Sequence, residues 1–183
     1  MTAAIRHLKK DKKLAKIIDQ VGKPNIPITK NSYESLVEAI ITQQLSGKAA
    51  DSISKKFRAI YGRFPKPASV LETSDDTLRK AGLSYMKISY IKDLSHKIET
   101  KQLRLHLMKS LSDEEVIAEL TTVKGIGRWT AEMFLIFSLG RQDVLPVGDL
   151  GLKKGIQRLY SMKELQEKEC IIRFVQSGFD SVF

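Results

Sequence analysis

The sequence predicts an all-α protein, and three observations support this fold class. Apolar residues recur at helical spacing along nearly the whole chain of 183 residues. Serine, asparagine or aspartate precedes most of these segments, where it can cap a helix, and glycine or proline follows several of them. We find no convincing alternating pattern of a half-buried strand, no repeat and no low-complexity stretch.

The first two predicted helices lie in the N-terminal third of the chain. Asn31 can cap the first one, with Glu34 at the third helical position in a capping-box arrangement. The apolar face of this helix comprises Tyr33, Leu36, Val37, Ile40 and Ile41. Ser46 begins the second helix, which Gly62 and Pro65 end. One face of the second helix carries Ala49, Ala50, Ile53, Phe57 and Ile60.

Two more helices are predicted in the middle of the chain. Ser74, followed by Asp75 and Asp76, opens a short helix that ends near Gly82. Residues 85–98 are typical of a basic amphipathic helix. Its inward face is expected to comprise Tyr85, Ile88, Ile91, Leu94 and Ile98.

A third pair of helices flanks a glycine-rich segment. Ser112 and Glu115 form a second capping box for a helix that runs through Leu120. Residues 128–139 form a strongly apolar helix that Gly140 stops. Two side chains of this helix are assigned to the core, Phe134 and Phe137.

The C-terminal region begins with the loop RQDVLPVGD, which leads to predicted helices at about 150–160 and 162–177. A chain of this length suggests one domain, or two small lobes that share a core. We therefore expect a single domain over residues 1–183.

The composition indicates an intracellular protein with a polyanionic partner. The net charge of +10 favours nucleic acid, although general solubility could also explain it. No apolar run is long enough to span a membrane, and the N-terminus lacks the apolar core of a secretion signal. Cys170 is the single cysteine, which excludes an internal disulfide and a four-cysteine iron–sulfur or zinc site.

The segment TTVKGIGRWTAE predicts a helix–hairpin–helix that binds the DNA backbone. Two glycines spaced by one residue allow positive φ angles and a close approach of another backbone. The N–H groups that start the next helix then attract phosphate, and flanking basic side chains add charge. The alternative is a plain helical corner, but a glycine cap needs one glycine, and Ile126 can plug the turn. The predicted DNA-binding residues are Lys124, Gly125, Ile126, Gly127, Arg128 and Thr130.

The segment LTTVKGIGRWTAEMFLIFSLGRQDVLPVGDLGL resembles the signature of the helix–hairpin–helix DNA glycosylase superfamily. Together with IITQQLSGKAADSI at 40–53, it is similar to the alkylbase branch, 3-methyladenine DNA glycosylase II. The likeness runs from about residue 33 to residue 160. It implies two helical lobes with the active-site cleft between them, the hairpin at 121–132 and a catalytic loop at 140–150.

The resemblance also implies the catalytic group and the base pocket. Asp149 occupies the position of the family's catalytic aspartate, where a carboxylate can stabilise positive charge on the sugar and orient water. Capping of the 150–160 helix is the alternative role of Asp149, and both can hold. Trp129 stands where bifunctional relatives carry a Schiff-base lysine, which implies a monofunctional enzyme. Trp129 and Met133 are the expected walls of the base pocket, a core tryptophan being the alternative.

Two further sites follow from the resemblance. The junction of Gln43, Gln44, Leu45 and Ser46 is expected to insert into the gap left by the flipped base, with Gln44 and Leu45 as the wedge. A buried Leu45 that packs the helix corner is the alternative. The backbone carbonyls of Thr121, Val123 and Ile126 are expected to hold Na⁺ or K⁺. No cofactor for catalysis is expected, and the three histidines are scattered: His7, His96 and His106.

The sequence thus predicts a monomeric, monofunctional DNA glycosylase of base excision repair. It would flip alkylated bases such as 3-methyladenine and 7-methylguanine from damaged double-stranded DNA and leave an abasic site. A bifunctional glycosylase/lyase is one alternative, which the tryptophan at position 129 disfavours. A non-catalytic helix–hairpin–helix protein that binds DNA or abasic sites is the other alternative.

Overall fold

The computed structural model describes residues 2–22, 25–163 and 171–172. The described residues form α-helices and one short 3₁₀ helix, with no strand among them, so the all-α prediction is confirmed. The chain divides into two compact units, which are described separately. The first unit combines the N-terminal segment up to residue 27 with the segment from residue 142 onward, and the second unit comprises residues 28–141.

The central helix of the second unit is α3 (Ser32–Thr42), which packs against α4 (Gly47–Tyr61). All five residues of the predicted apolar face of α3 are buried. Asn31 caps α3 by accepting a hydrogen bond from the Glu34 N–H at 3.2 Å. The Glu34 carboxylate is bound to Arg58 of α4 at 2.7 Å, so only the first half of the predicted capping box is present.

On α4 the predicted apolar face is partly wrong. Ala50 and Phe57 are buried, and Ile53 and Ile60 are half-buried. Ala49 is exposed in the first turn of α4, at the edge of this face.

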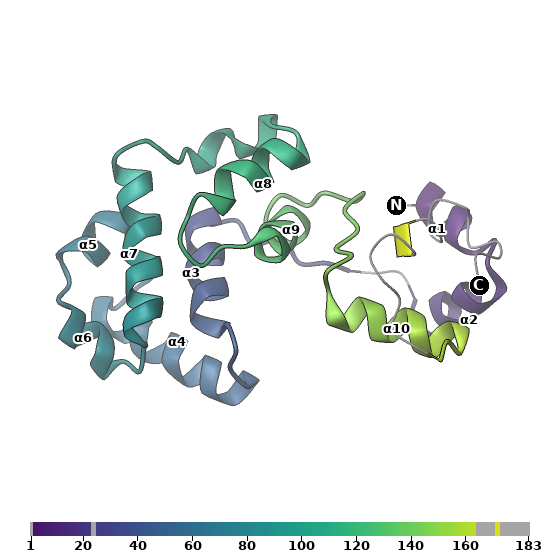
Figure 1. The fold of residues 1–183 in the computed structure, drawn as a ribbon, viewed down its shortest axis with the longest axis horizontal. Helices are drawn as coiled ribbons and strands as arrows, with labels where there is room; N and C mark the ends of the chain where they lie inside the picture. Colours follow the sequence, from purple (N-terminus) through teal and green to yellow (C-terminus); the bar gives the residue numbers. More distant parts are fainter. Residues whose placement is uncertain (1, 23–24, 164–170, 173–183) are drawn as a thin grey trace. The chain divides into compact units, whose positions relative to one another are not determined.

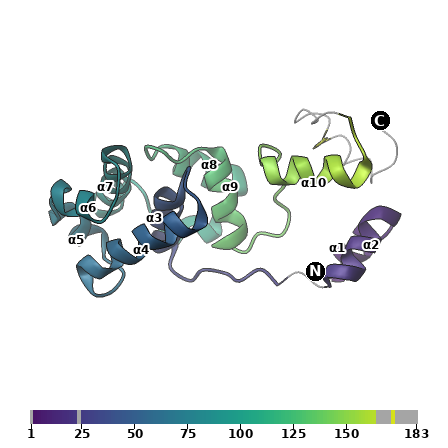
Figure 2. The same cartoon turned by 90° about the horizontal axis from the view of Figure 1, so that it is seen from below.

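Helix α7 (Tyr85–Glu99) packs against α3 and against two short helices, α5 (Pro67–Glu72) and α6 (Asp75–Lys80) (Figures 1 and 2). Its buried residues are Ile88, Ile91, Leu94 and Ser95. Tyr85, predicted to point inward, is 63% exposed. It is the first residue of the helix, and its ring stacks under the Arg79 guanidinium at 4.7 Å instead of entering the core.

The remaining elements of the second unit are η1 (Leu105–Ser110), α8 (Asp113–Thr121) and α9 (Arg128–Phe137). The predicted capping box of Ser112 and Glu115 is confirmed, with both reciprocal bonds present. Helix α9 packs on α8 and α3. Phe134 is buried as predicted. Phe137 is 42% exposed because it is the last residue of α9, so its assignment to the core is wrong.

The first unit contains α1 (Thr2–Leu8), α2 (Lys12–Val21) and α10 (Leu150–Tyr160), with α10 in contact with α2. Residues 150–160 are helical as predicted, whereas the predicted helix at 162–177 lies largely outside the described residues. Within the described ranges, no helix combines the length and apolar character needed to cross a membrane.

Candidate DNA interface and active site

The turn between α8 and α9 has a tight backbone that depends on Gly125. Gly125 has φ of +78°, a conformation that residues with a side chain rarely adopt. A Cβ atom on Gly125 would also lie 2.0 Å from the Tyr90 ring of α7, so the backbone rests directly on that ring. Gly127 differs, because its φ of −95° is open to any residue and a Cβ there would meet nothing within 4 Å. The expectation of positive φ angles therefore holds for Gly125 and is wrong for Gly127.

Two apolar side chains anchor the turn from inside. Val123 and Ile126 are both buried, so Ile126 plugs the corner as predicted. The Ile126 N–H donates to the Val123 carbonyl at 3.1 Å, which closes the turn ahead of Gly127. Gly127 then caps α9 without a side chain, so no side-chain oxygen covers the first turn of that helix.

Helix α7 also holds the turn through a carboxylate. The Asp93 Oδ2 accepts a hydrogen bond from the Lys124 N–H at 2.9 Å, and it forms an ion pair with the Lys97 ammonium at 2.6 Å. Partial burial acts to raise the pKa of Asp93, but the Lys97 ammonium and the Lys124 N–H outweigh it, and the pKa of Asp93 lies below its usual value. The carboxylate is therefore ionised at neutral pH, and the Lys124 side chain is left exposed.

The other charged residue of the hairpin has acidic neighbours. Arg128 forms ion pairs with Glu114 at 2.5 Å and with the buried Glu132 at 3.1 Å. The pair with Glu114 is exposed on both sides, and such pairs contribute little to stability, so a phosphate could replace Glu114. Thr130, predicted to bind DNA, has a buried side chain. The third position of α9 turns the Thr130 side chain toward α3, so a contact of Thr130 with DNA would use its backbone N–H.

Helix α9 presents an apolar face outside the core. Trp129, Met133 and Phe137 follow at intervals of four residues, with Trp129 47% exposed and Met133 half-buried. Trp129 is therefore not a core residue, which was the alternative assignment. A hollow of about 210 Å³ lies between α3 and α9, lined by Ala39, Thr42, Met133 and Phe137 among others.

The junction between α3 and α4 projects two side chains of the predicted wedge. Gln44 has a left-handed backbone with φ of 56°, and Leu45 is 37% exposed. Leu45 is therefore not buried in the helix corner, which was the alternative assignment. Gln43 differs from its neighbours because its Nε2 donates to the Gly125 carbonyl at 2.8 Å. Ser46 caps α4 without a side-chain hydrogen bond.

Asp149 lies in the first unit and caps α10. Its Oδ1 accepts a hydrogen bond from the Leu152 N–H at 2.7 Å, as the capping alternative predicted. The preceding loop forms a tight turn, in which the Asp149 N–H donates to the Pro146 carbonyl at 2.8 Å. A Cβ on Gly151 would lie 3.0 Å from Oδ1, so glycine at this position leaves room for the carboxylate.

The chemistry of the predicted cation ligands fits a hard monovalent ion. Thr121 is the last residue of α8, and the carbonyl oxygens at a helix C-terminus have no intrahelical donor. Val123 and Ile126 lie in the turn that follows, outside both helices. The Val123 carbonyl also accepts from the Ile126 N–H, which leaves it a second lone pair. Histidine, cysteine and carboxylate side chains do not gather in groups of three anywhere in the described ranges.

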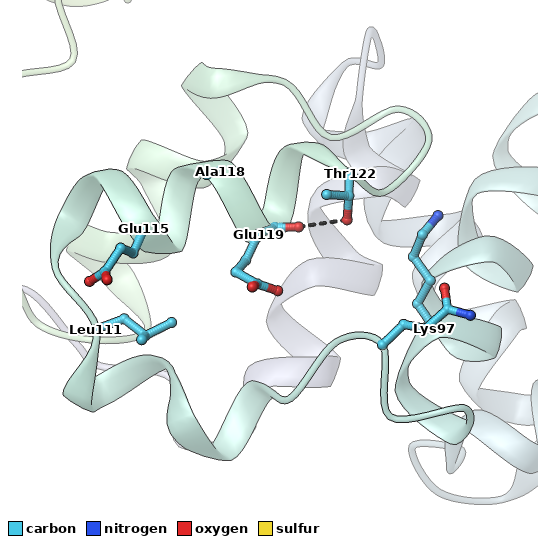
Figure 3. Close-up of a pocket in the computed structure, with 7 residues that line it drawn as sticks. Lys97, Leu111, Glu115, Ala118, Glu119 and Thr122 are labelled. Carbon is cyan, nitrogen blue, oxygen red and sulfur yellow. Dashed lines mark hydrogen bonds between the residues drawn. The ribbon is translucent and has the colours of Figure 1, made fainter.

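A separate hollow of about 490 Å³ beside α8 has the wrong charge for DNA. Figure 3 shows Glu115 and Glu119 of α8 on the side that borders this hollow, with Lys97 opposite them. The Glu115 carboxylate is already bound by the Ser112 N–H of the cap at 2.7 Å. Carboxylates repel phosphate, so the hairpin turn is the better candidate for a DNA interface in this unit.

Sequence reasoning missed two residues that position the site. Lys87 of α7 donates to the carbonyls of Ile41 and Gln43 at 2.7 and 2.8 Å. Tyr90 of α7 lies under Gly125. No local pattern marks either residue, because their partners are tens of positions away along the chain.

The turn between α8 and α9 thus joins its helices as a helix–hairpin–helix does, and an aspartate-capped helix follows it along the chain. The chain belongs to the HhH-GPD superfamily of base excision DNA repair proteins, whose family model matches residues 37–179.

Individual relatives narrow the similarity within this family. The chain is 36% identical over 170 residues to DNA-3-methyladenine glycosylase 1 of Schizosaccharomyces pombe, covering 88% of this chain and 72% of that protein. A solved structure of the S. pombe 3-methyladenine DNA glycosylase in complex with abasic DNA matches with a TM-score of 0.84 at 34% identity, covering 97% and 90% of the two chains. A DNA-3-methyladenine glycosidase from Bacillus halodurans matches with a TM-score of 0.83 at 37% identity, covering 95% and 80%.

Proposed function

We propose that the protein is a monofunctional DNA glycosylase that excises alkylated bases from duplex DNA. The observation that carries the proposal is the similarity, over nearly the whole chain, to enzymes named for 3-methyladenine excision. Two features of the structure support it. The hairpin turn offers a backbone surface for phosphate, and Asp149 is held at a helix start.

DNA binding begins at the hairpin. The open space around Gly127 lets a phosphate approach the first turn of α9, where backbone N–H groups and the helix dipole favour an anion. Lys124 adds a positive charge beside this surface. Arg128 exchanges its exposed partner Glu114 for a phosphate when DNA binds. The carbonyls of Thr121, Val123 and Ile126 would hold Na⁺ or K⁺, and the charge of the ion would add to the attraction for the phosphate.

Base flipping uses the junction between α3 and α4. Leu45 and Gln44 fill the space that the flipped nucleotide leaves in the duplex, which lowers the cost of unstacking. The apolar face of α9 receives the extruded base. Trp129 stacks on a ring that alkylation has made cationic, and Met133 forms a second wall.

Excision breaks the bond between C1′ of the sugar and the base nitrogen. A base alkylated at N3 or N7 is cationic, so it takes the electron pair of that bond and departs as a neutral molecule. The Asp149 carboxylate stabilises the positive charge that develops on the sugar. Water then bonds to C1′ through its oxygen and passes one proton to the carboxylate and on to solvent. Position 129 carries tryptophan, which lacks an amine to form a Schiff base, so the strand stays intact.

The partner is damaged double-stranded DNA, and we propose that the protein acts as a monomer inside the cell. The net charge of +10 supports association with a polyanion.

Incubation of the protein with duplex DNA carrying 3-methyladenine or 7-methylguanine tests the proposal. Released bases are measured by chromatography, and strand breaks are scored before and after alkali. We expect free alkylated bases and breaks that appear only after alkali. Tight binding to an abasic duplex with no released base would instead identify a non-catalytic hairpin protein.

A further inference from the structure

Helix α7 carries, on one face, the residues that hold both DNA-facing elements of the second unit. Lys87, Tyr90 and Asp93 follow at intervals of three residues, which places them side by side on the helix. Tyr90 and Asp93 hold the hairpin turn: the Tyr90 ring lies against Gly125, and the Asp93 carboxylate accepts a hydrogen bond from the Lys124 N–H. Lys87 binds the end of α3.

The Lys87 ammonium occupies the C-terminus of α3. Carbonyls in the last turn of a helix have no intrahelical donor, and the helix dipole makes them attractive to a cation. Lys87 donates to the carbonyls of Ile41 and Gln43 at 2.7 and 2.8 Å. These two carbonyls are the bonds of the ammonium, and no ion pair of Lys87 with a carboxylate occurs among the described residues. Partial burial lowers the pKa of Lys87.

Of the two carbonyls that Lys87 binds, the Gln43 carbonyl affects the backbone conformation of the wedge. It belongs to the peptide group that directly precedes Gln44, and the orientation of that peptide sets the φ angle of Gln44. A left-handed φ of 56° is unfavourable for a residue with a side chain, so it must be held by neighbouring contacts. Lys87 holds it from α7. The Gln43 side chain then joins the same junction to the hairpin through the Gly125 carbonyl at 2.8 Å.

We propose that Lys87 is a positioning residue that holds the wedge at a set distance from the hairpin. This proposal rests on the proposed function of the junction, Gln44 and Leu45, in filling the flipped-base gap. Lys87 does not touch DNA in this mechanism. It keeps the wedge in register with the phosphates bound at the hairpin, so that one binding event places both.

The test is a double-mutant cycle between Lys87→Met and Leu45→Ala. Methionine keeps the unbranched stem and removes the ammonium. Loss of alignment at a reacting centre reduces rates by the order of ten- to a hundredfold, so we expect such a fall in single-turnover excision for Lys87→Met. If Lys87 acts through the wedge, the double variant excises about as slowly as the slower single variant. Lys87→Arg, which keeps a cation, is expected to recover part of the rate.

Arg58→Met is the matched control. Arg58 is also a cation that ties a neighbouring helix to α3, through Glu34 and Glu38 at 2.7 and 2.8 Å, but at the opposite end of α3 from the junction. Arg58→Met and Leu45→Ala are expected to act independently, so the fold-loss of excision rate in their double variant should equal the product of the two single losses. Thermal melts identify any variant that fails to fold. If Lys87→Met does not fold, Gln43→Ala, which cuts the bond to the hairpin, takes its place in the cycle with the same expectation.

A second readout separates this proposal from the proposed function. A duplex with a tetrahydrofuran abasic analogue beside 2-aminopurine reports unstacking by fluorescence without any excision. We expect wild-type protein to raise the fluorescence and Lys87→Met to raise it less, with equal salt dependence of binding. A wild-type protein that releases no base would contradict the glycosylase activity alone. Two results would overturn the role of Lys87. The first is a fluorescence increase with Lys87→Met equal to that of the wild type. The second is a double variant whose loss of rate equals the product of the losses in the two single variants.

Discussion

Replacement of Asp149 by asparagine separates its helix cap from its proposed catalytic role, because asparagine keeps the capping oxygen and removes the charge. The bond from the Leu152 N–H to Oδ1, 2.7 Å long, can be made equally well by an amide oxygen, and asparagine and aspartate are similar helix caps. The variant loses the attraction between the carboxylate and the helix dipole, which is about 0.3–1 kcal/mol. For a chain of this size, such a change lowers Tm by no more than about 4 °C.

The effect on catalysis is expected to be larger than the effect on stability. Loss of one preorganised electrostatic group at a charged transition state lowers the rate on the order of a hundredfold or more, which corresponds to about 2.7 kcal/mol. Binding to an abasic duplex should persist or tighten, because a carboxylate no longer lies near phosphates. The assay is single-turnover excision of 3-methyladenine or 7-methylguanine, with a thermal melt of the same sample.

Asp11→Asn is the control for this substitution. Asp11 caps α2 with the same geometry, its Oδ1 accepting from the Leu14 N–H at 2.7 Å, and it belongs to the same unit as Asp149. It should leave excision unchanged. If folded Asp149→Asn excises at the wild-type rate, Asp149 is a helix cap only and the proposed mechanism is wrong.

The remaining predictions concern the hairpin and the chemistry at position 129. Gly125→Ala should lower stability by roughly 2–4 kcal/mol, from the positive φ and the overlap with the Tyr90 ring, seen as a fall in Tm. Gly127→Ala should fold, at a cost of about 1 kcal/mol as a poorer cap, yet weaken binding to all duplexes alike; undiminished binding would exclude the phosphate site. Lys124→Ala should reduce the slope of log K against log salt concentration by roughly one unit, and an unchanged slope would place its charge elsewhere. Borohydride should trap no covalent adduct with DNA, because Trp129 cannot form a Schiff base; a trapped adduct would refute the monofunctional assignment. The pKa of Asp93 is depressed in the folded state, so its stabilising contribution is present above its unfolded value of about 4 and is lost as pH falls through the folded value. The difference in Tm between wild type and Asp93→Asn should therefore shrink on acidification below about pH 4, and a constant difference would show that the charge is not what holds the turn.

The parts of the protein that the sequence predicted well are those set by neighbours along the chain. The apolar face of α3 is buried in full, because helical periodicity brings residues three and four apart to one side. The caps at Asn31, Ser112 and Asp149 are correct because a capping side chain binds an N–H only three residues away. Gly125 was also identified locally, since its positive φ is a property of one residue.

The outer limits of each apolar face were predicted less well. Tyr85 and Phe137 fit the helical period of their segments but are largely exposed. Periodicity gives the direction of a side chain around its helix and says nothing about where the neighbouring helix ends. Tyr85 is the first residue of α7 and Phe137 the last residue of α9, so the packed core covers each of them only in part.

What the sequence alone determined, therefore, is an all-α chain with a glycine-containing hairpin and a capped aspartate, since these depend on contacts across three or four residues. Only the tertiary structure decided how the hairpin is held. The bond from Gln43 to the Gly125 carbonyl spans 82 positions, and the bonds from Lys87 to the end of α3 span more than forty. Such contacts form because packing of α3, α7 and the hairpin brings unsatisfied carbonyls next to a donor, and buried polar groups must find partners wherever the fold supplies them.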